Sequence, residues 1–158
     1  MPHCRTNSQF GDYIFEKTLS LNKKEILTDK IDIEKTFNYW IETSDKDFNT
    51  MINLYLSKDY HWSLFVGHIV IERLLKAYFV RELSQHAPFT HDLRRLAKLS
   101  KMNISKEHLD WLDTITTFNL NARYDSYKQA FYKKCTTEFT TEWYEKIKSL
   151  RLWIKKKL

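Results

Sequence analysis

The sequence predicts an all-α fold, a single-domain up-and-down bundle of about five helices. Its 158 residues include only two Gly and two Pro, so turns are scarce and the elements between them must be long. Residues 60–83 form one uninterrupted stretch that is apolar on nearly every side when it is placed on a helix. A chain of this length suits one domain with a sizeable core, and an aromatic content of 15% argues against a disordered protein.

The stretch 60–83 is expected to be the central helix, because a helix with so little polar surface must be covered on most sides. Its polar strip, which is either a functional site or a solvent-facing seam, consists of His61, His68, Glu72 and Lys76. Glu72 and Lys76 stand four residues apart in the order that favours an ion pair. They could close a buried seam as a salt bridge, or Lys76 could join His68 and Arg123 in a cluster facing a phosphate.

The other elements follow from local patterns along the chain. Residues 1–30 show little sustained period and are expected to form an arm packed on the bundle, which spans residues 31–158. Apolar residues at three- and four-residue spacing predict four further helices, at about 32–58, after the N-cap Thr90, from 105 to 118 and from 136 to 154. The short link at 58–60 makes the first two helices antiparallel neighbours. Residues 119–127 break the pattern and are expected to form the end of a helix that runs into a structured loop.

The net charge of +6 is concentrated near the end of the chain. Residues 1–119 carry 16 basic and 16 acidic residues, whereas residues 120–158 carry 10 basic and 4 acidic ones. This excess has two readings that the sequence leaves open. It is either helix-dipole compensation with a solubilising tail, or a basic face for a nucleotide or RNA.

Several classes of protein are disfavoured by what the sequence lacks. It has no Gly-rich phosphate loop, no metal-ligand spacing around Cys4 or Cys135, no secretory signal and no stretch apolar enough to span a membrane. We therefore expect no metal, no cofactor and no membrane contact. Two free thiols and a cytoplasmic location are the corresponding expectations.

Five short segments resemble one known family. They are Tyr39-Trp40, Trp62 to His68, Ile71 to Ala77, Thr90-His91-Asp92-Leu93 and Ala122-Arg123-Tyr124-Asp125. In this order they resemble the HEPN domain, over about residues 36–156. The resemblance implies a helical bundle that commonly forms a homodimer. It also implies one of two roles: an RNA-cleaving toxin, or a module linked to nucleotide binding or to a partner nucleotidyltransferase.

The ribonuclease branch of the family carries an Arg followed, after four to six residues, by a His. No His follows Arg123, and the positions that would hold it are Tyr127, Lys128, Gln129 and Ala130. Metal-independent RNA cleavage needs groups that take and give protons, and Tyr or Lys would do so at unfavourable pKa values. The spacing of Arg81 and His86 is treated as coincidence, because it lies at the end of the central helix. A non-catalytic module is therefore expected.

Two alternatives to that reading remain open. One is a metal-independent RNase toxin with a divergent site, acting in a toxin-antitoxin or phage-defence system. The other is a module for protein interaction alone.

The candidate ligand-binding residues are Arg123, Tyr124, Lys76 and Lys128, supported by His68, Glu72, His91, Asp92 and Asp125. An Arg can grip phosphate oxygens with two donors, and a Tyr can stack on a base. In the structural alternative Arg123 pairs with Asp125 or another carboxylate, and Tyr124 fills the end of the bundle. His91 with Asp92 is either a dyad or a helix cap with an oriented His. Any chemistry is expected where the polar strip approaches Arg123.

Overall fold

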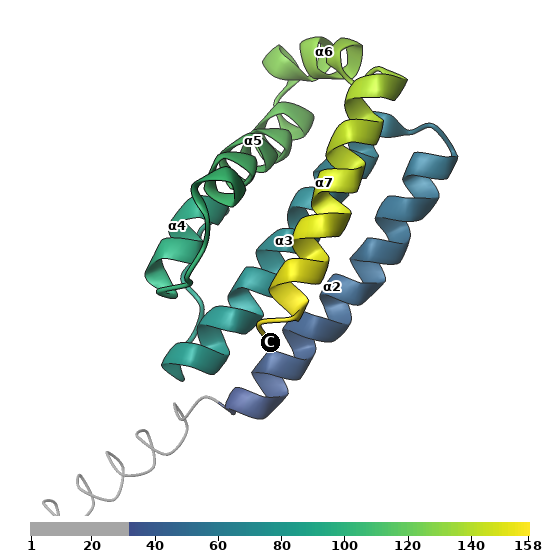
Figure 1. Cartoon of the computed structure of the whole chain (residues 1–158). Helices are drawn as coiled ribbons and strands as arrows, with labels where there is room; N and C mark the ends of the chain where they lie inside the picture. Colours follow the sequence, from purple (N-terminus) through teal and green to yellow (C-terminus); the bar gives the residue numbers. More distant parts are fainter. Residues whose placement is uncertain (1–31) are drawn as a thin grey trace, which may run out of the picture. The chain divides into compact units, whose positions relative to one another are not determined.

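The computed structural model describes residues 32–158, and the fold over this range is built from six helices without a strand. This confirms the predicted all-α bundle. The predicted arm at residues 1–30 lies outside the described residues. The helices are α2 (Ile33–Leu56), α3 (Tyr60–Leu83), α4 (Leu93–Leu99), α5 (Lys106–Arg123), α6 (Asp125–Lys134) and α7 (Thr137–Lys155). The four long helices α2, α3, α5 and α7 run up and down, as shown in Figure 1.

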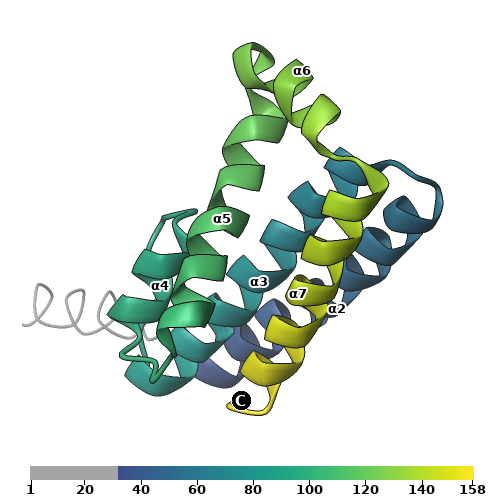
Figure 2. The same cartoon turned by 45° about the horizontal axis from the view of Figure 1, so that its top comes forward.

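Helices α2 and α3 form the antiparallel pair that the short link predicted (Figures 1 and 2). Helix α2 ends in a left-handed turn at Lys58, where φ is 67°. The amide of Lys58 donates to the carbonyl of Tyr55 at 3.1 Å, and the amide of Asp59 donates to that of Leu54 at 2.9 Å. These two bonds close the end of α2 in a Schellman motif and turn the chain directly into α3.

Helix α3 is the centre of the bundle, as its apolar sequence predicted. It packs against each of the other five described helices, and its buried side chains lie all around its axis. Gly67 marks the closest approach of its neighbours. A Cβ at this position would lie 2.7 Å from Cδ1 of Ile147 on α7 and 3.0 Å from the sulfur of Met51 on α2. Helix α3 therefore has little freedom to shift, which fixes the place of any side chain it contributes to a site.

Residues 119–127 are helical almost throughout, so the expected loop is wrong. Helix α5 continues to Arg123, and only Tyr124 separates it from α6. The extension of α5 is held by Asn119, which is buried and whose amide oxygen accepts from Nη1 of Arg123 at 3.2 Å. Helix α6 crosses the end of the bundle between α5 and α7 (Figures 1 and 2). Phe131, its one buried residue, stacks on Phe118 of α5 with ring centroids 5.6 Å apart.

The segment before α4 is fixed at both ends by hydrogen bonds. Asp92, and not Thr90 as predicted, is the N-cap of α4: its carboxylate accepts from the amide of Arg95 at 2.9 Å. The hydroxyl of Thr90 instead accepts from the amide of Asp92 at 3.2 Å. The next amide, that of Leu93, donates to the hydroxyl of Thr116 on α5 at 3.2 Å. These bonds hold the residue between Thr90 and Asp92, His91, in a defined position.

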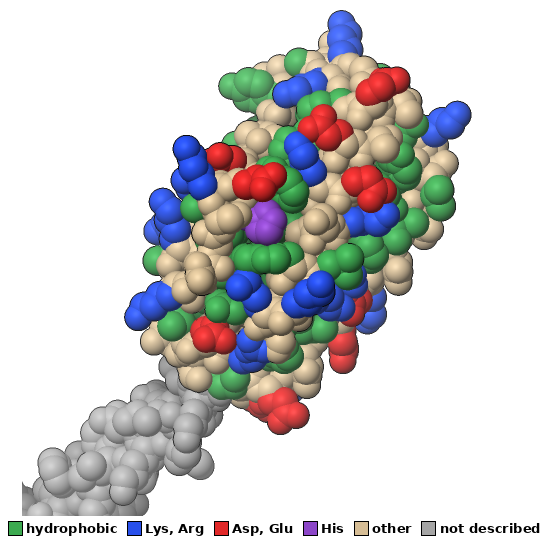
Figure 3. All heavy atoms as spheres, viewed as in Figure 1, with side chains coloured by type: hydrophobic (Ala, Val, Ile, Leu, Met, Phe, Trp, Pro, Cys, Tyr) green, Lys and Arg blue, Asp and Glu red, His purple; other side chains and the backbone are tan. Residues whose placement is uncertain are grey.

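All four basic residues of α7 take part in ion pairs. Arg151 and Lys155 both reach Asp45 of α2 at 2.7 Å, and they tie the last helix to the first described one. Lys146 and Lys148 pair with acidic residues one turn earlier on α7 itself. The face with α7 at its centre accordingly shows basic and acidic side chains interspersed (Figure 3). Among the helices of residues 32–158, none is both long and apolar enough to cross a bilayer.

Candidate functional site

The polar strip of α3 is the starting point of the candidate site. Its members His68, Glu72 and Lys76 are buried, with relative exposures of 1%, 7% and 9%. Nζ of Lys76 donates to Oε1 of Glu72 at 2.7 Å, which is the salt bridge that their spacing predicted. These three residues are therefore not a solvent-facing seam. They form a polar network beneath the surface.

His91 joins this network from the segment before α4. Its Nδ1 lies 2.9 Å from Oε2 of Glu72, so the carboxylate is bonded through both oxygens. Burial alone would raise the pKa of Glu72, but the hydrogen bonds from Lys76 and His91 outweigh it and lower the pKa below its ordinary value. Glu72 therefore stays ionised and holds the ring of His91 in one orientation.

His68 holds the backbone of the same segment. Its Nε2 lies 3.0 Å from the carbonyl oxygen of His91, and because a carbonyl only accepts, Nε2 carries the proton. Burial lowers the pKa of His68, despite this bond and the nearby Glu72 carboxylate. Its other nitrogen, Nδ1, is buried and has no hydrogen bond among residues 32–158. His68 is therefore a neutral support for His91 at neutral pH.

Arg123 ends α5 with an exposed guanidinium. Its Nη1 donates to the neutral amide of Asn119, and none of the ion pairs found within residues 32–158 involves it. The expected alternative, a pair with Asp125, is therefore not formed. Tyr124 is 54% exposed and does not fill the end of the bundle. Both side chains are available to a ligand.

Two pockets meet at Arg123, and they share His91, Asn119 and Arg123; we call them the Arg123 pockets. The first has a volume of about 320 Å³ and is lined by Tyr39, Trp40, Phe65, His68, Ile69, Glu72, Arg73, His91, Asn119 and Arg123. The second has a volume of about 370 Å³ and is lined by His91, Asp92, Thr116, Asn119, Leu120, Arg123 and Tyr124. The structure thus brings part of the α3 strip to Arg123, across more than fifty positions of sequence.

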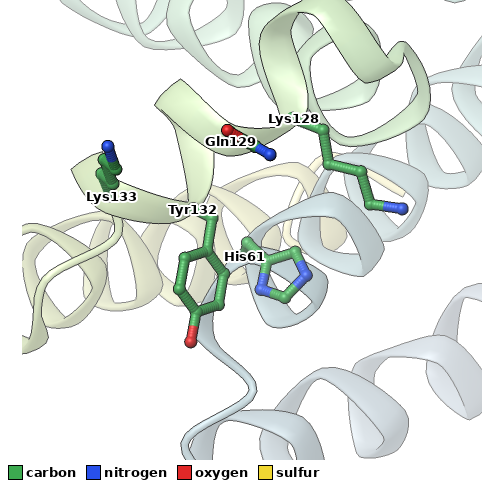
Figure 4. Close-up of a pocket in the computed structure, with 5 residues that line it drawn as sticks. All are labelled: His61, Lys128, Gln129, Tyr132 and Lys133. Carbon is green, nitrogen blue, oxygen red and sulfur yellow. The ribbon is translucent and has the colours of Figure 1, made fainter.

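Two of the predicted ligand-binding residues lie elsewhere. Lys76 lines neither of the Arg123 pockets: its Nζ is bonded to Glu72 and lies 5.1 Å from the ring centroid of Trp40. Lys128 lines a different pocket on α6 (Figure 4), where its Nζ lies 5.6 Å from the ring centroid of Trp62. Asp125 is the exposed first residue of α6 and lines neither Arg123 pocket.

The structure adds residues that the sequence reasoning missed. Asn119, which looked like a helix end, lies one turn before Arg123 and orients it. This spacing of four was the one available signal, because residues i and i+4 share a helix face. Tyr39, Trp40 and Arg73 also line the first pocket. Arg73 is less available than Arg123, since its Nη1 pairs with Asp47 at 2.9 Å.

The arrangement has a definite chemical capacity. Because Glu72 only accepts, Nδ1 of His91 carries the proton and Nε2 is left as the acceptor nitrogen of a ring that is half exposed. A carboxylate-oriented imidazole of this kind can accept a proton, and a guanidinium in the same pocket can bind phosphate oxygens. His91 therefore acts with Glu72 rather than with Asp92, whose carboxylate caps α4.

Metal and thiol chemistry find no support among the described residues. Within residues 32–158 no three His, Cys, Asp or Glu side chains are arranged to hold a metal ion. Burial raises the pKa of the Cys135 thiol to about 12, so this thiol is unreactive at neutral pH. Cys4 lies outside the described residues.

Comparison with known proteins gave one match. The family model of the HEPN domain matches residues 37–158, which is most of the chain and includes all six described helices except the first turn of α2. A search of curated proteins found no match, and neither did a search of solved structures. The family match covers every residue of the Arg123 pockets. The chain belongs to the HEPN domain family.

Proposed function

We propose that this HEPN domain binds a nucleotide or a nucleic-acid phosphate in the Arg123 pockets, and that it acts as a binding module. Family membership supports a nucleotide- or RNA-related role in general terms. The observation that carries the proposal is an exposed guanidinium that lines both pockets and is fixed by Asn119, with no ion pair to any described carboxylate. A pre-oriented and uncompensated Arg is the group best suited to grip phosphate oxygens.

The rest of the pockets suits the other parts of a nucleotide. Tyr124 and Tyr39 are each 54% exposed, so each offers a face on which a base can stack. The buried Glu72 is matched by Lys76 and therefore adds little net negative charge to the first pocket. Volumes of about 320 and 370 Å³ are within the range of roughly 300–1,000 Å³ that small-molecule sites occupy.

The proposal extends to partners and location. The family resemblance supports a homodimer and a nucleotidyltransferase as partner protein, and the cytoplasm is the compartment in which both would meet nucleotides. Light scattering on a gel-filtration column would test the dimer by its mass. Co-purification with a nucleotidyltransferase encoded beside this chain would test the partner.

Nucleotide titration tests the binding proposal. Isothermal calorimetry with a nucleoside triphosphate should show saturable binding below millimolar concentration. Arg123→Ala should weaken it by about tenfold or more, since hydrogen bonds to charged groups are worth about 1.5–3 kcal/mol. Arg123→Lys should be intermediate, because it keeps the charge and loses the two-pronged grip. Arg95→Ala, at an exposed Arg on α4, is the matched control and should bind normally.

Absence of saturable binding at millimolar nucleotide would overturn the proposal. Equal binding by Arg123→Ala would move the site elsewhere. Circular dichroism of each variant shows whether a loss reflects the ligand contact or the fold, because Arg123 also bonds to the buried Asn119.

One observation favours a second candidate function, metal-independent RNA cleavage. His91 has its Nδ1 bonded to Glu72 and lies in the same pockets as Arg123, so the imidazole missing after Arg123 in sequence is supplied from the segment before α4. Its Nε2 could take the 2′-hydroxyl proton as O2′ attacks phosphorus, and the P–O5′ bond then breaks to leave a 2′,3′-cyclic phosphate. A solvent water would protonate the leaving 5′ oxygen, and the hydroxide formed would take the proton back from His91. Incubation of RNA with chelator separates the two functions: cleavage that is lost in His91→Gln supports this one, and no cleavage by the wild type excludes it.

A further inference from the structure

A second hollow lies between α6 and the start of α3, apart from the Arg123 pockets. It has a volume of about 520 Å³ and is lined by His61, Lys128, Gln129, Tyr132 and Lys133; we call it the α6 pocket. Four of these residues recur at one-turn spacing on one face of α6, and His61 comes from the first turn of α3. No lining residue is shared with either Arg123 pocket.

The floor of the α6 pocket is aromatic. The rings of His61 and Tyr132 meet edge to face with centroids 5.1 Å apart, and Figure 4 shows them adjacent beneath Gln129. The ring of Trp62 lies 5.1 Å from that of His61. Tyr132 is 65% exposed and Trp62 is 37% exposed, although both are large enough to be core residues. Exposed rings gathered at one place leave faces on which a planar ligand can stack.

The sides of the α6 pocket are basic. Lys128 and Lys133 extend to opposite sides of the aromatic pair (Figure 4), and Lys134 follows directly. None of these three lysines takes part in an ion pair found among residues 32–158, whereas all three lysines of α7 do. Unpaired ammonium groups beside an exposed aromatic surface attract a ligand that is both anionic and planar.

The charges facing His61 are Lys128 from α6 and Asp59 from the link before α3. Burial lowers the pKa of His61, Asp59 raises it and Lys128 lowers it again, with a net effect below the ordinary value. The imidazole is therefore neutral at physiological pH. A neutral ring adds stacking surface without adding a further charge.

We infer that the α6 pocket binds a nucleotide unit of a single-stranded nucleic acid, with its base stacked on Tyr132 and His61 and its flanking phosphates held by Lys128 and Lys133. Gln129, which lies between Lys128 and Lys133 above the two rings (Figure 4), can donate to and accept from a base edge. The combination of stacking rings and phosphate-binding lysines is the means by which proteins bind unpaired strands with little sequence preference. A duplex, whose bases are already stacked and paired, does not fit this mode.

This inference goes beyond the phosphate site at Arg123 and does not depend on it. Tyr124 and Arg123 precede α6 directly, so a strand held in the α6 pocket could continue along α6 to the Arg123 pockets. Such a strand would place a base and its flanking phosphates in the α6 pocket and one further phosphate in the Arg123 pockets. The two sites can be tested separately because they share no residue.

Fluorescence anisotropy with a labelled 12-nucleotide single-stranded RNA tests the inference on the full chain. Tyr132→Ala should weaken binding by about 5- to 150-fold, the range for loss of one stacked base. Tyr132→Phe keeps the ring and should bind like the wild type. Lys106→Ala, at an exposed Lys on α5 outside the pocket, is the control for general charge and should change little.

Salt dependence gives a second and independent readout. For a single strand, each neutralised phosphate contributes about −0.7 to the slope of log K against log salt. Lys128→Gln and Lys133→Gln should therefore each reduce the slope by about 0.7, and Tyr132→Ala should leave it nearly unchanged. DNA of the same sequence shows whether the 2′-hydroxyl matters, a mononucleotide shows whether one unit is enough, and a hairpin duplex should bind more weakly than the single strand.

Two outcomes would overturn the inference. One is unchanged affinity in Tyr132→Ala together with an unchanged salt slope in both lysine variants. The other is duplex binding as tight as that of the single strand. If Arg123→Ala abolished binding while all the α6 variants bound normally, the proposed function would stand and the α6 pocket would not be a site. If instead the α6 variants lost binding while Arg123→Ala bound normally, the α6 pocket would be supported as a site and the Arg123 site would be rejected.

Discussion

At the scale of single residues, Glu72 shows what local spacing can and cannot predict. Its pair with Lys76 followed from the interval of four on a helix, because that interval brings two side chains together whatever the tertiary fold. Its bond to His91 could not be predicted, because it depends on where the segment before α4 lies against α3. For the same reason the sequence could not predict that His91 and Arg123 line the same pockets. That shared location is the observation behind RNA cleavage as the second candidate function.

His68 leads to a prediction about pH. Burial lowers its pKa in the folded protein, so the unfolded chain binds a proton more readily as the pH falls below the ordinary value of 6.5. Stability from this residue is complete above about pH 6.5 and is lost as the pH falls toward the folded pKa, by up to about 1.4 kcal/mol per pH unit. His68→Gln keeps a donor for the carbonyl of His91 and cannot titrate. Its stability should therefore fall less steeply.

Urea unfolding between about pH 7.5 and pH 5.5 measures this difference, since that range contains the ordinary pKa of histidine. The lowered pKa of Glu72 acts at more acid pH and should be common to both proteins. His86→Gln, which changes an exposed histidine of the α3–α4 segment, is the matched control and should show the wild-type slope. Parallel curves for His68→Gln and the wild type would contradict the assignment of a neutral, buried imidazole.

At the scale of helices, the sequence pattern identified helices that carry a long apolar stripe and missed helix segments that carry none. The bounds predicted for the central helix agree with those of α3, because its apolar surface is nearly continuous. Helix α6 was missed, and its first residues fell within the expected loop, because it carries no apolar stripe: Phe131 is its one buried residue. The end of α5 was missed for a related reason. Asn119 is polar and so falls outside an apolar stripe, but it is buried and its side-chain oxygen accepts a hydrogen bond from Arg123.

The ends of the helices give a prediction about backbone strain. With so few Gly in the chain, left-handed turns fall on residues with side chains, and Lys101 after α4 has φ of 56°. Its amide donates to the carbonyl of Lys98 at 3.0 Å, and the next amide donates to that of Ala97 at 3.1 Å, as in a Schellman motif. Lys101→Gly should therefore stabilise the protein by about 0.5–1 kcal/mol, because Gly adopts this conformation without a steric cost.

Lys98→Gly is the matched control for this change. Lys98 is an exposed residue inside α4, so Gly there should destabilise by about 1 kcal/mol. Chemical unfolding of the two variants should thus give shifts of opposite sign. A loss of stability in Lys101→Gly would mean that the exposed Lys side chain stabilises the folded protein by more free energy than its left-handed backbone conformation costs.

At the scale of the whole described unit, the basic excess near the end of the chain separates into two parts. Lys146, Lys148, Arg151 and Lys155 of α7 are paired with carboxylates, so helix stabilisation and packing account for them. The basic residues from Arg123 through α6 are not paired in this way. Pairing thus accounts for the charge of α7, and a ligand-binding face stays a prediction for the segment from Arg123 through α6 alone. A count of charges could not separate the two segments, because the partner Asp45 is more than 100 positions away in sequence.

The packing of every helix on α3 predicts that the bundle unfolds as one cooperative unit. Residues 33–158 form one compact unit, and the five Trp of the chain lie within it, on α2, α3, α5 and α7. A fragment that begins at Asp32 should therefore give coincident urea transitions by Trp fluorescence and by far-ultraviolet circular dichroism, as a two-state domain does. Two separated midpoints would show instead that part of the bundle, such as α6 with its single buried Phe131, opens first. The full chain is the comparison for this fragment. If residues 1–30 pack on the bundle as predicted, the full chain should unfold at a higher urea midpoint than the fragment.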